Sequence, residues 1–190
     1  MNVELVSSAL PLFQLNHERT KGRHVSTIIY DLCLRRGIYK EQDQSEMDTT
    51  RMRLGQAWEH ALIAQTRLEH PNRYIEIPEI ELDGIYGHLD LYDTQLHAVD
   101  EIKCTWMSSR HDIDSDKLWK YLVQLQAYLM MIRSTTGNLK VVYPRGDYRD
   151  KMVDYRHWKL EFSKSEIVNN WRTLQTHADL MEREGHQWQA

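Results

Sequence analysis

The sequence Gly84-Ile-Tyr-Gly-His-Leu-Asp90, followed by Val99-Asp-Glu-Ile-Lys103, decides the fold of this chain. Both stretches have the alternating apolar residues of β-strands, and the short connection between them predicts a hairpin. Residues two apart on a strand share a face, so Glu101 and Lys103 point the same way. The neighbouring strand brings Asp90 close to that pair. We therefore expect two carboxylates and one ammonium to meet on one side of a sheet.

Two carboxylates beside a lysine suit metal-assisted hydrolysis. Mg²⁺ and Mn²⁺ prefer hard oxygen ligands and keep waters that can be activated. A lysine at such a site can orient the attacking water or balance charge on a phosphate. The alternative is an ordinary polar strand face with a surface ion pair. Flanking apolar residues favour the first interpretation, because unpaired charges in a buried hairpin are costly without a ligand. These residues are Ile85, Leu89, Leu91, Val99 and Ile102.

Periodic apolar residues predict helices and further strands around this hairpin. The predicted helices are Thr27–Tyr39 with Ser26 as N-cap, Arg53–Leu68, Lys117–Arg133, and a last one from the cap Ser163 to about Arg183. The predicted strands are Tyr74–Ile80, Ile85–Asp93, Leu96–Lys103, Leu139–Tyr143 and Lys151–Phe162. Residues 1–24 are expected to form an irregular arm or a short helix, and 41–50 a loop. This order predicts an α/β fold with a central mixed β-sheet flanked by helices. We expect one domain over residues 1–190, with a core at about 25–162 and a C-terminal helix at about 163–184.

The composition excludes several classes of protein. A net charge of −4 gives no overall attraction to nucleic acid, so any DNA contact needs a local basic patch. The 10 histidines show no HxxxH or HExxH spacing, which argues against a zinc site of that type. Cys33 and Cys104 lie far apart and are expected to be reduced core residues. Without an apolar run of about 18 residues or a signal pattern, the sequence predicts an intracellular, cytoplasmic protein with no membrane contact.

Five short motifs, in order, resemble those of the PD-(D/E)XK nuclease superfamily, in its RecB-like and lambda-exonuclease-like branch. Gly-His-Leu-Asp90 and Asp-Glu101-Ile-Lys103 are similar to its central motif pair. Gly55-Gln-Ala-Trp-Glu59 resembles its Gly-x-x-x-(His/Glu) helix, and Gln124-Leu-Gln-Ala-Tyr128 its Gln-x-x-x-Tyr helix. The stretch from Ser26 to Cys33-Leu-Arg-Arg-Gly-Ile-Tyr39 resembles its Ser…Cys-Pro-Arg-Arg-x-Tyr helix, with leucine where proline is usual. The resemblance covers about residues 24–145 and implies a restriction-endonuclease-like core.

The resemblance implies roles for the central residues. Asp90 and Glu101 would be metal ligands, the backbone carbonyl of Ile102 a further ligand, and Lys103 the catalytic lysine. Glu59 stands where the family has a helical ligand. His60 is the alternative, because the family often has histidine in this role and neighbours on a helix point about 100° apart.

A second set of residues is expected to bind substrate. Gln124 and Tyr128 stand one helical turn apart, and Lys117 and Tyr121 extend the same polar stripe. In the family this face meets the nucleic acid backbone; the alternative is a buried Gln–Tyr pair that serves only packing. Trp106, in the loop after the Lys103 strand, is a candidate for stacking on a base, with core packing as its alternative. The candidate phosphate contacts are Arg35, Arg36 and Arg53.

The sequence thus predicts a Mg²⁺- or Mn²⁺-dependent deoxyribonuclease, an exonuclease of recombination, repair or phage DNA metabolism. A structure-specific endonuclease is one alternative, and a non-catalytic DNA-binding protein that retains the nuclease fold is another. DNA is the expected partner, and a homo-oligomer is possible as in some relatives. The CRISPR-adaptation and AddB-like relatives carry a four-cysteine cluster, but this chain lacks their C-terminal cysteine trio, so no iron–sulfur cluster is expected.

Overall fold

The structure, a computed structural model, describes residues 19–38, 46–149 and 152–188. Its helices are α1 (Val25–Arg35), α2 (Glu46–Glu69), α3 (Asp116–Ile132) and α4 (Lys164–Arg183). Its strands are β1 (Arg23–His24), β2 (Tyr74–Ile75), β3 (Ile80–Leu82), β4 (Ile85–Gly87), β5 (Leu91–Asp93), β6 (Ala98–Cys104), β7 (Thr136–Tyr143) and β8 (Asp154–Glu161).

The main sheet has the strand order β2-β5-β6-β7-β8 and is mixed. Strands β6 and β7 run parallel, while the other neighbours in this sheet are antiparallel. A parallel pair needs a long connection, and α3 supplies it. A second, small sheet has the order β1-β4-β3. The mixed sheet flanked by helices is the fold class that the sequence predicted.

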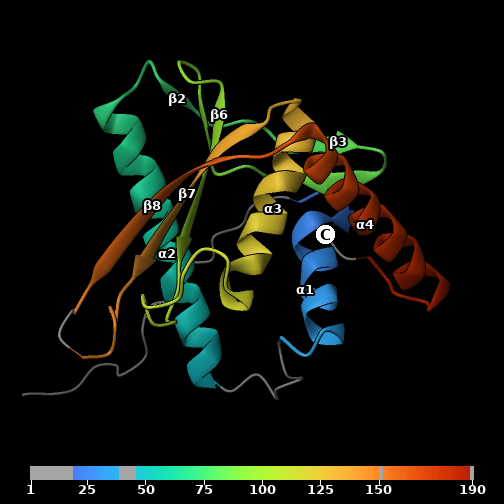
Figure 1. Cartoon of the computed structure of the whole chain (residues 1–190), viewed down its shortest axis with the longest axis horizontal. Coiled ribbons are helices and arrows are strands. Elements are labelled where there is room, and N and C mark those ends of the chain that lie inside the picture. Colours follow the sequence, from blue (N-terminus) through green and yellow to red (C-terminus); the bar gives the residue numbers. More distant parts are fainter. Residues whose placement is uncertain (1–18, 39–45, 150–151, 189–190) are drawn as a thin grey trace, which may run out of the picture.

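Helices cover the main sheet unequally. Figure 1 shows α2 on one side of the strands and α3, α1 and α4 on the other. The larger hydrophobic core lies on the α3 side, and it includes Val99, Leu125 and Leu139. The smaller core joins α2 to the opposite face through Ile63 and Ile102. In the described part of the chain, no helix has the length and hydropathy that a bilayer crossing requires.

Strongly patterned segments fold as predicted. Helix α3 differs from the predicted Lys117–Arg133 by one residue at each end. Helix α4 begins directly after Ser163, which caps it: the Ser163 hydroxyl accepts a hydrogen bond from the Glu166 amide at 3.2 Å. The Ser163 amide donates to the Glu166 carboxylate at 2.7 Å, which completes a capping box.

Several predicted helix limits were wrong. Helix α1 begins at Val25 rather than Thr27, and its N-cap is His24, so Ser26 lies inside the helix and does not cap it. It ends at Arg35, before the predicted end at Tyr39, which lies outside the described residues. Helix α2 begins at Glu46, inside the predicted loop. Apolar periodicity reports only the face of a helix that packs on a core, so the polar residues 46–50 gave no helix signal. Most of the predicted N-terminal arm and residues 41–45 also lie outside the described residues.

The predicted strand Ile85–Asp93 is two strands in different sheets. Strand β4 pairs with β1 and β3, whereas β5 pairs with β2 and β6. Residues 88–90 carry the chain from one sheet to the other. The predicted strand Tyr74–Ile80 divides in the same way into β2 and the start of β3. The hairpin between β5 and β6 is confirmed, but Asp90 precedes β5 and lies at the break between the sheets.

Candidate active site

The site forms where strand β6 loses its neighbour. Strand β5 pairs with β6 only between Ala98 and Asp100, whereas β7 pairs with β6 as far as Cys104. Side chains take over on the unpaired edge: the Ile102 amide donates to Asp90 Oδ2 at 2.8 Å, and the Cys104 amide donates to Glu59 Oε1 at 2.8 Å. Two carboxylates from distant parts of the sequence thus replace a strand partner.

Gly55 explains why Glu59 reaches this edge. A Cβ atom on Gly55 would lie 3.3 Å from the Cys104 carbonyl oxygen, closer than most side chains tolerate. Glycine therefore lets α2 lie directly against β6. Glu59 follows one helical turn later on the same face, where it meets the Cys104 amide. The close contact between α2 and β6 therefore explains the Gly-x-x-x-Glu spacing: glycine permits the contact, and the glutamate one turn later reaches the strand.

Glu101 and Lys103 point to the α3 side of the sheet, the side of Val99, as their spacing predicted. Glu101 is fully buried, at 0% exposure. Lys103 Nζ forms ion pairs with Glu101 Oε1 at 2.6 Å and with Asp90 Oδ2 at 3.3 Å. Among the described residues, neither carboxylate oxygen of Glu101 accepts a hydrogen bond of normal geometry.

This crowding sets the proton affinities of the site. Burial, reinforced by the charge of Asp90, raises the pKa of Glu101 to about 8. Burial also raises the pKa of Glu59, against the opposing effects of Lys103 and the Cys104 amide. Burial alone would lower the pKa of Lys103, but Asp90, Glu101 and Glu59 outweigh it and hold that pKa well above its usual value. The lysine is a permanent cation among three carboxylates.

The predicted polar stripe of α3 faces the same place. Gln124 Nε2 donates to Tyr128 Oη at 2.7 Å, so the expected pair exists. Tyr128 is buried and Gln124 is partly exposed. Tyr121 is also buried, and burial raises its pKa to about 12 against the lowering effect of a hydrogen bond with the Thr105 side chain. The polar stripe therefore contains buried tyrosines, which pack in the core, and Gln124, which is partly exposed in the site.

Two clefts meet at the carboxylates. The first, of about 450 Å³, includes His60, Asp90 and Tyr128 in its walls, and the second, of about 380 Å³, includes Lys120 and Tyr121. The residues common to both clefts are Ser26, Gln56, Glu59, Lys103 and Gln124. A continuous depression therefore crosses the site, with Lys103 and Glu59 at its middle.

The predicted phosphate contacts are not brought to these clefts. Arg35, Arg36 and Arg53 line neither of them. Arg35 forms ion pairs with Asp31 on the same helix and with Glu184, and the pair with Glu184 connects α1 to the end of α4. The Arg36 guanidinium lies 4.2 Å from the ring centre of Trp119. The residues of α1 that line the clefts lie in its first half, between Val25 and Tyr30. Arg35 and Arg36 stand at the end of the helix, beyond those residues.

Sequence reasoning missed several residues that line the clefts, among them Lys120 and Gln56. Lys120 is half-buried in the second cleft, and burial lowers its pKa to about 8. Its position between Lys117 and Gln124, at spacings of three and four, placed it on the predicted stripe. Gln56 lines both clefts, and its distance of three residues from Glu59 was a similar signal.

Oxygen donors at the site match a hard divalent cation. Glu101 has two buried oxygens, of which Oε1 lies 2.6 Å from the Lys103 ammonium, and Asp90 and Glu59 each commit one oxygen to the backbone of β6. The carbonyl of Ile102 lies on the same edge as its amide, because both groups of one residue face the same side of a strand. In the described ranges, however, no three His, Cys, Asp or Glu side chains already stand close enough to hold a metal. The lysine ammonium lies against the carboxylates instead.

Comparisons with known proteins reveal relatives in structure alone. No family model matches the chain, and no curated protein is significantly similar in sequence. A phage-related exonuclease from Haemophilus somnus 129PT has a TM-score of 0.50 and 13% identity over 85% of this chain and 83% of its own. The protein SSO0001 has a TM-score of 0.49 and 19% identity, covering 85% and 79%. An alkaline exonuclease from Laribacter hongkongensis has a TM-score of 0.46 and 15% identity, covering 86% and 92%. The likeness to the phage-related exonuclease shows a shared fold, and it agrees with the predicted α/β core built on a mixed sheet.

Proposed function

We propose that this chain, which shares its fold with a phage-related exonuclease, is a nuclease that hydrolyses DNA phosphodiester bonds with Mg²⁺ or Mn²⁺. One observation carries the proposal: Lys103 pairs with Asp90 and with the buried Glu101, and Lys103, Asp90 and Glu59 line a cleft open to solvent. In an ion-pair network that serves only stability, we would expect each buried carboxylate to pair with a cation of its own. Here Glu101 is buried and shares the single ammonium of Lys103 with Asp90, which is costly unless a further cation binds there in the working state.

In this proposal Asp90, Glu101, Glu59 and the Ile102 carbonyl hold the metal. When bound, a divalent cation supplies an activated water and offsets charge on the phosphate. Lys103 positions the attacking water or stabilises the phosphate oxygens, since it is a fixed cation at the meeting of the clefts. Gln124 and Tyr128 orient the substrate from α3, with the Tyr128 ring held by burial and by Gln124.

End-labelled linear DNA and closed circular DNA, incubated with Mg²⁺, Mn²⁺ or EDTA, test this function. We expect metal-dependent loss of linear DNA with circles intact, as for an exonuclease of recombination, repair or phage DNA metabolism. Cutting of circles would favour the structure-specific endonuclease. Binding of DNA without any cleavage would favour the non-catalytic alternative and overturn the proposal.

The helical ligand gives a first prediction. Glu59→Gln should lower metal-dependent cleavage at least about tenfold, whereas His60→Gln should change it much less, because Glu59 is the residue fixed to the edge of β6. Glutamine keeps an oxygen for the Cys104 amide, so the fold is preserved. Cleavage rates at saturating Mn²⁺, with thermal midpoints as the folding control, compare the two variants. The reverse ranking would make His60 the ligand.

A second prediction concerns pH and metal. The folded-state pKa of Glu101, about 8, lies above its ordinary value of 4.5, so between these values the folded state binds more protons than the unfolded state. This contribution to the free energy of unfolding therefore falls as pH rises from about 4.5 to about 8. In EDTA, the midpoint of the wild type relative to Glu101→Gln should decrease over this range. Mn²⁺ should raise the wild-type midpoint more at pH 8 than at pH 6. A difference that stays constant with pH would contradict the assignment.

A further inference from the structure

The polar stripe of α3 continues past the two clefts into a third hollow. This hollow, of about 410 Å³, is lined by Ile38, Met107, Ser108, His111, Lys117, Lys120 and Tyr148. Lys120 belongs to both the second and the third hollow, just as Gln124 belongs to the first and second. From Tyr128 back to Lys117, α3 thus lines three adjoining hollows. At a rise of 1.5 Å per residue this path is about 16 Å long.

Charge changes along this path. The first cleft contains the carboxylates Glu59, Glu76 and Asp90. Among the described residues, one carboxylate lines the second and third hollows: Glu59, which accepts from the Cys104 amide. Their cationic side chains are Arg51, Lys103, Lys117 and Lys120. In a chain of net charge −4, this local excess of cations is not a general property of the surface. It suits a polyanion.

Aromatic rings accompany these cations. Tyr30 and Trp106 line the second hollow, and Tyr148 lines the third. Tyr30 and Tyr148 are about half exposed, at 50% and 53%. The loop that carries Trp106 is fixed at both sides: its indole Nε1 donates to the Arg51 carbonyl at 3.0 Å, and its own carbonyl accepts from the Tyr148 hydroxyl. Trp106 and Tyr148 therefore have defined positions in the hollows.

We propose that the second and third hollows bind a single-stranded segment of nucleic acid that continues from the active site. This inference rests on the proposed nuclease function and adds the strandedness of the bound substrate. Cations that follow a groove, together with exposed rings, are what single-strand binding requires, because rings stack on bases that are free of a duplex. A duplex presents its phosphates to a surface, and its bases are already stacked.

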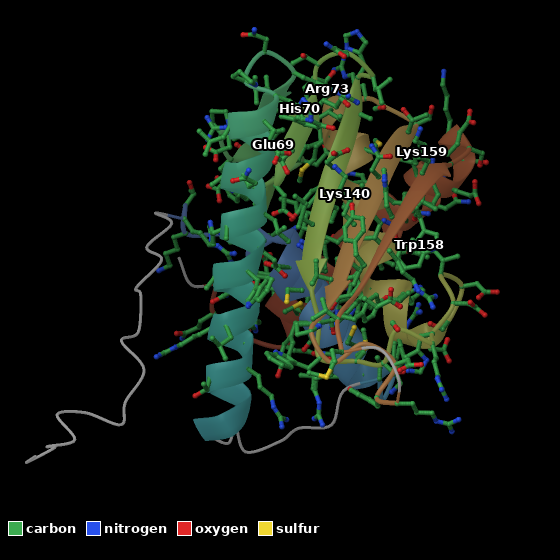
Figure 2. The ribbon with its side chains drawn as sticks, turned by 90° about the vertical axis from the view of Figure 1, so that its left-hand side faces the viewer. Glu69, His70, Arg73, Lys140, Trp158 and Lys159 are labelled. Atoms are coloured by element: carbon green, nitrogen blue, oxygen red, sulfur yellow. The ribbon has the colours of Figure 1, made fainter. Side chains whose placement is uncertain are left out.

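Fluorescence anisotropy tests this track with a labelled single-stranded 12-mer and a blunt duplex of the same length, in EDTA so that neither is cut. The variants are Lys117→Ala, Lys120→Gln and Tyr30→Leu. The control is Lys159→Ala, an exposed lysine on the edge strand β8 (Figure 2) that lines none of the three hollows. Thermal midpoints verify that each variant is folded.

Phosphate contacts and ring contacts have different signatures. Each lysine variant should weaken single-strand binding and reduce the slope of log affinity against log salt by about 0.7. Tyr30→Leu should weaken single-strand binding about fivefold or more with an unchanged slope. Duplex affinity should change little in all variants, and Lys159→Ala should match the wild type with both DNAs.

Two results would overturn the track. Wild-type affinity and salt slope in Lys117→Ala and Lys120→Gln would show that the cations do not contact the strand. Equal weakening of duplex and single-strand binding would show that the hollows bind a duplex. Both results are independent of cleavage: if the wild type does not cut DNA with Mg²⁺ or Mn²⁺, the nuclease proposal fails, whereas these binding data decide the track.

Discussion

Glu101→Gln and Asp90→Asn should each reduce DNA cleavage by about 10³-fold or more, because each removes a negative charge where the proposed cation binds. Both amides keep the shape of the side chain, and the Asp90→Asn variant retains an oxygen for the Ile102 amide. In EDTA, Glu101→Gln should be at least as stable as the wild type, since burial and the charge of Asp90 disfavour the Glu101 carboxylate, and Lys103 keeps Asp90 as its partner in the variant. Cleavage rates with Mn²⁺ and thermal midpoints in EDTA measure both effects.

Asp100 offers a matched control on the same strand. It is also fully buried, but it faces the α2 side and has its own donors, Lys140 and Asn138. Asp100→Asn should therefore destabilise the fold by about 1–3 kcal/mol and leave the cleavage rate of the folded protein near the wild-type value. Full activity in Glu101→Gln, or loss of activity in Asp100→Asn without unfolding, would contradict the assignment of the site to the α3 face.

Leu125→Ala should lower the free energy of unfolding by about 2–5 kcal/mol through the cavity that it leaves. Leu125 is fully buried on α3, and its methyl groups lie against the backbone of Gly137 on β7, where a Cβ atom would come within 2.9 Å. Gly137 has no side chain that could fill the space left by Leu125. The chain that remains folded should cleave DNA normally, because Leu125 faces the core.

Gln124→Ala should have the opposite effect. Its side chain lines both clefts, so its loss should lower cleavage at least about tenfold while the midpoint changes little. Urea unfolding and single-turnover cleavage on the two variants give the comparison. If Gln124→Ala melts early and its folded fraction cuts normally, the pair with Tyr128 serves packing alone.

Much of the fold was readable from the sequence because its signals are local. The spacing of Leu118, Leu125 and Leu129 predicted α3, and all three side chains are fully buried. The two-residue spacing of Glu101 and Lys103 predicted their common face, and the structure places their charged groups 2.6 Å apart. Such periods survive folding because they depend only on the geometry of one helix or one strand.

What the sequence could not supply depends on distant segments. Ile85, Leu89 and Leu91 are buried with the alternation of one strand, although the chain changes sheets between them. Alternating apolar residues indicate which side chains are buried, and this alternation continues through residues 88–90, where the chain passes from one sheet to the other. The sequence pattern therefore could not reveal the change of sheet that positions Asp90. The partners of Arg35 are likewise set by α4, whose end brings Glu184 to α1. A contact across 149 residues leaves no periodic trace.

The unpaired edge of β6 also bears on how the molecule assembles. The amides of Ile102 and Cys104 donate to the carboxylates of Asp90 and Glu59. These two amides are therefore protected only when residues 88–90 and α2 have both packed against β6. Hydrogen exchange at these amides therefore reports completion of the active site, separately from formation of the sheet on the β7 side. Such exchange would show whether the site opens locally while the sheet and α3 stay folded.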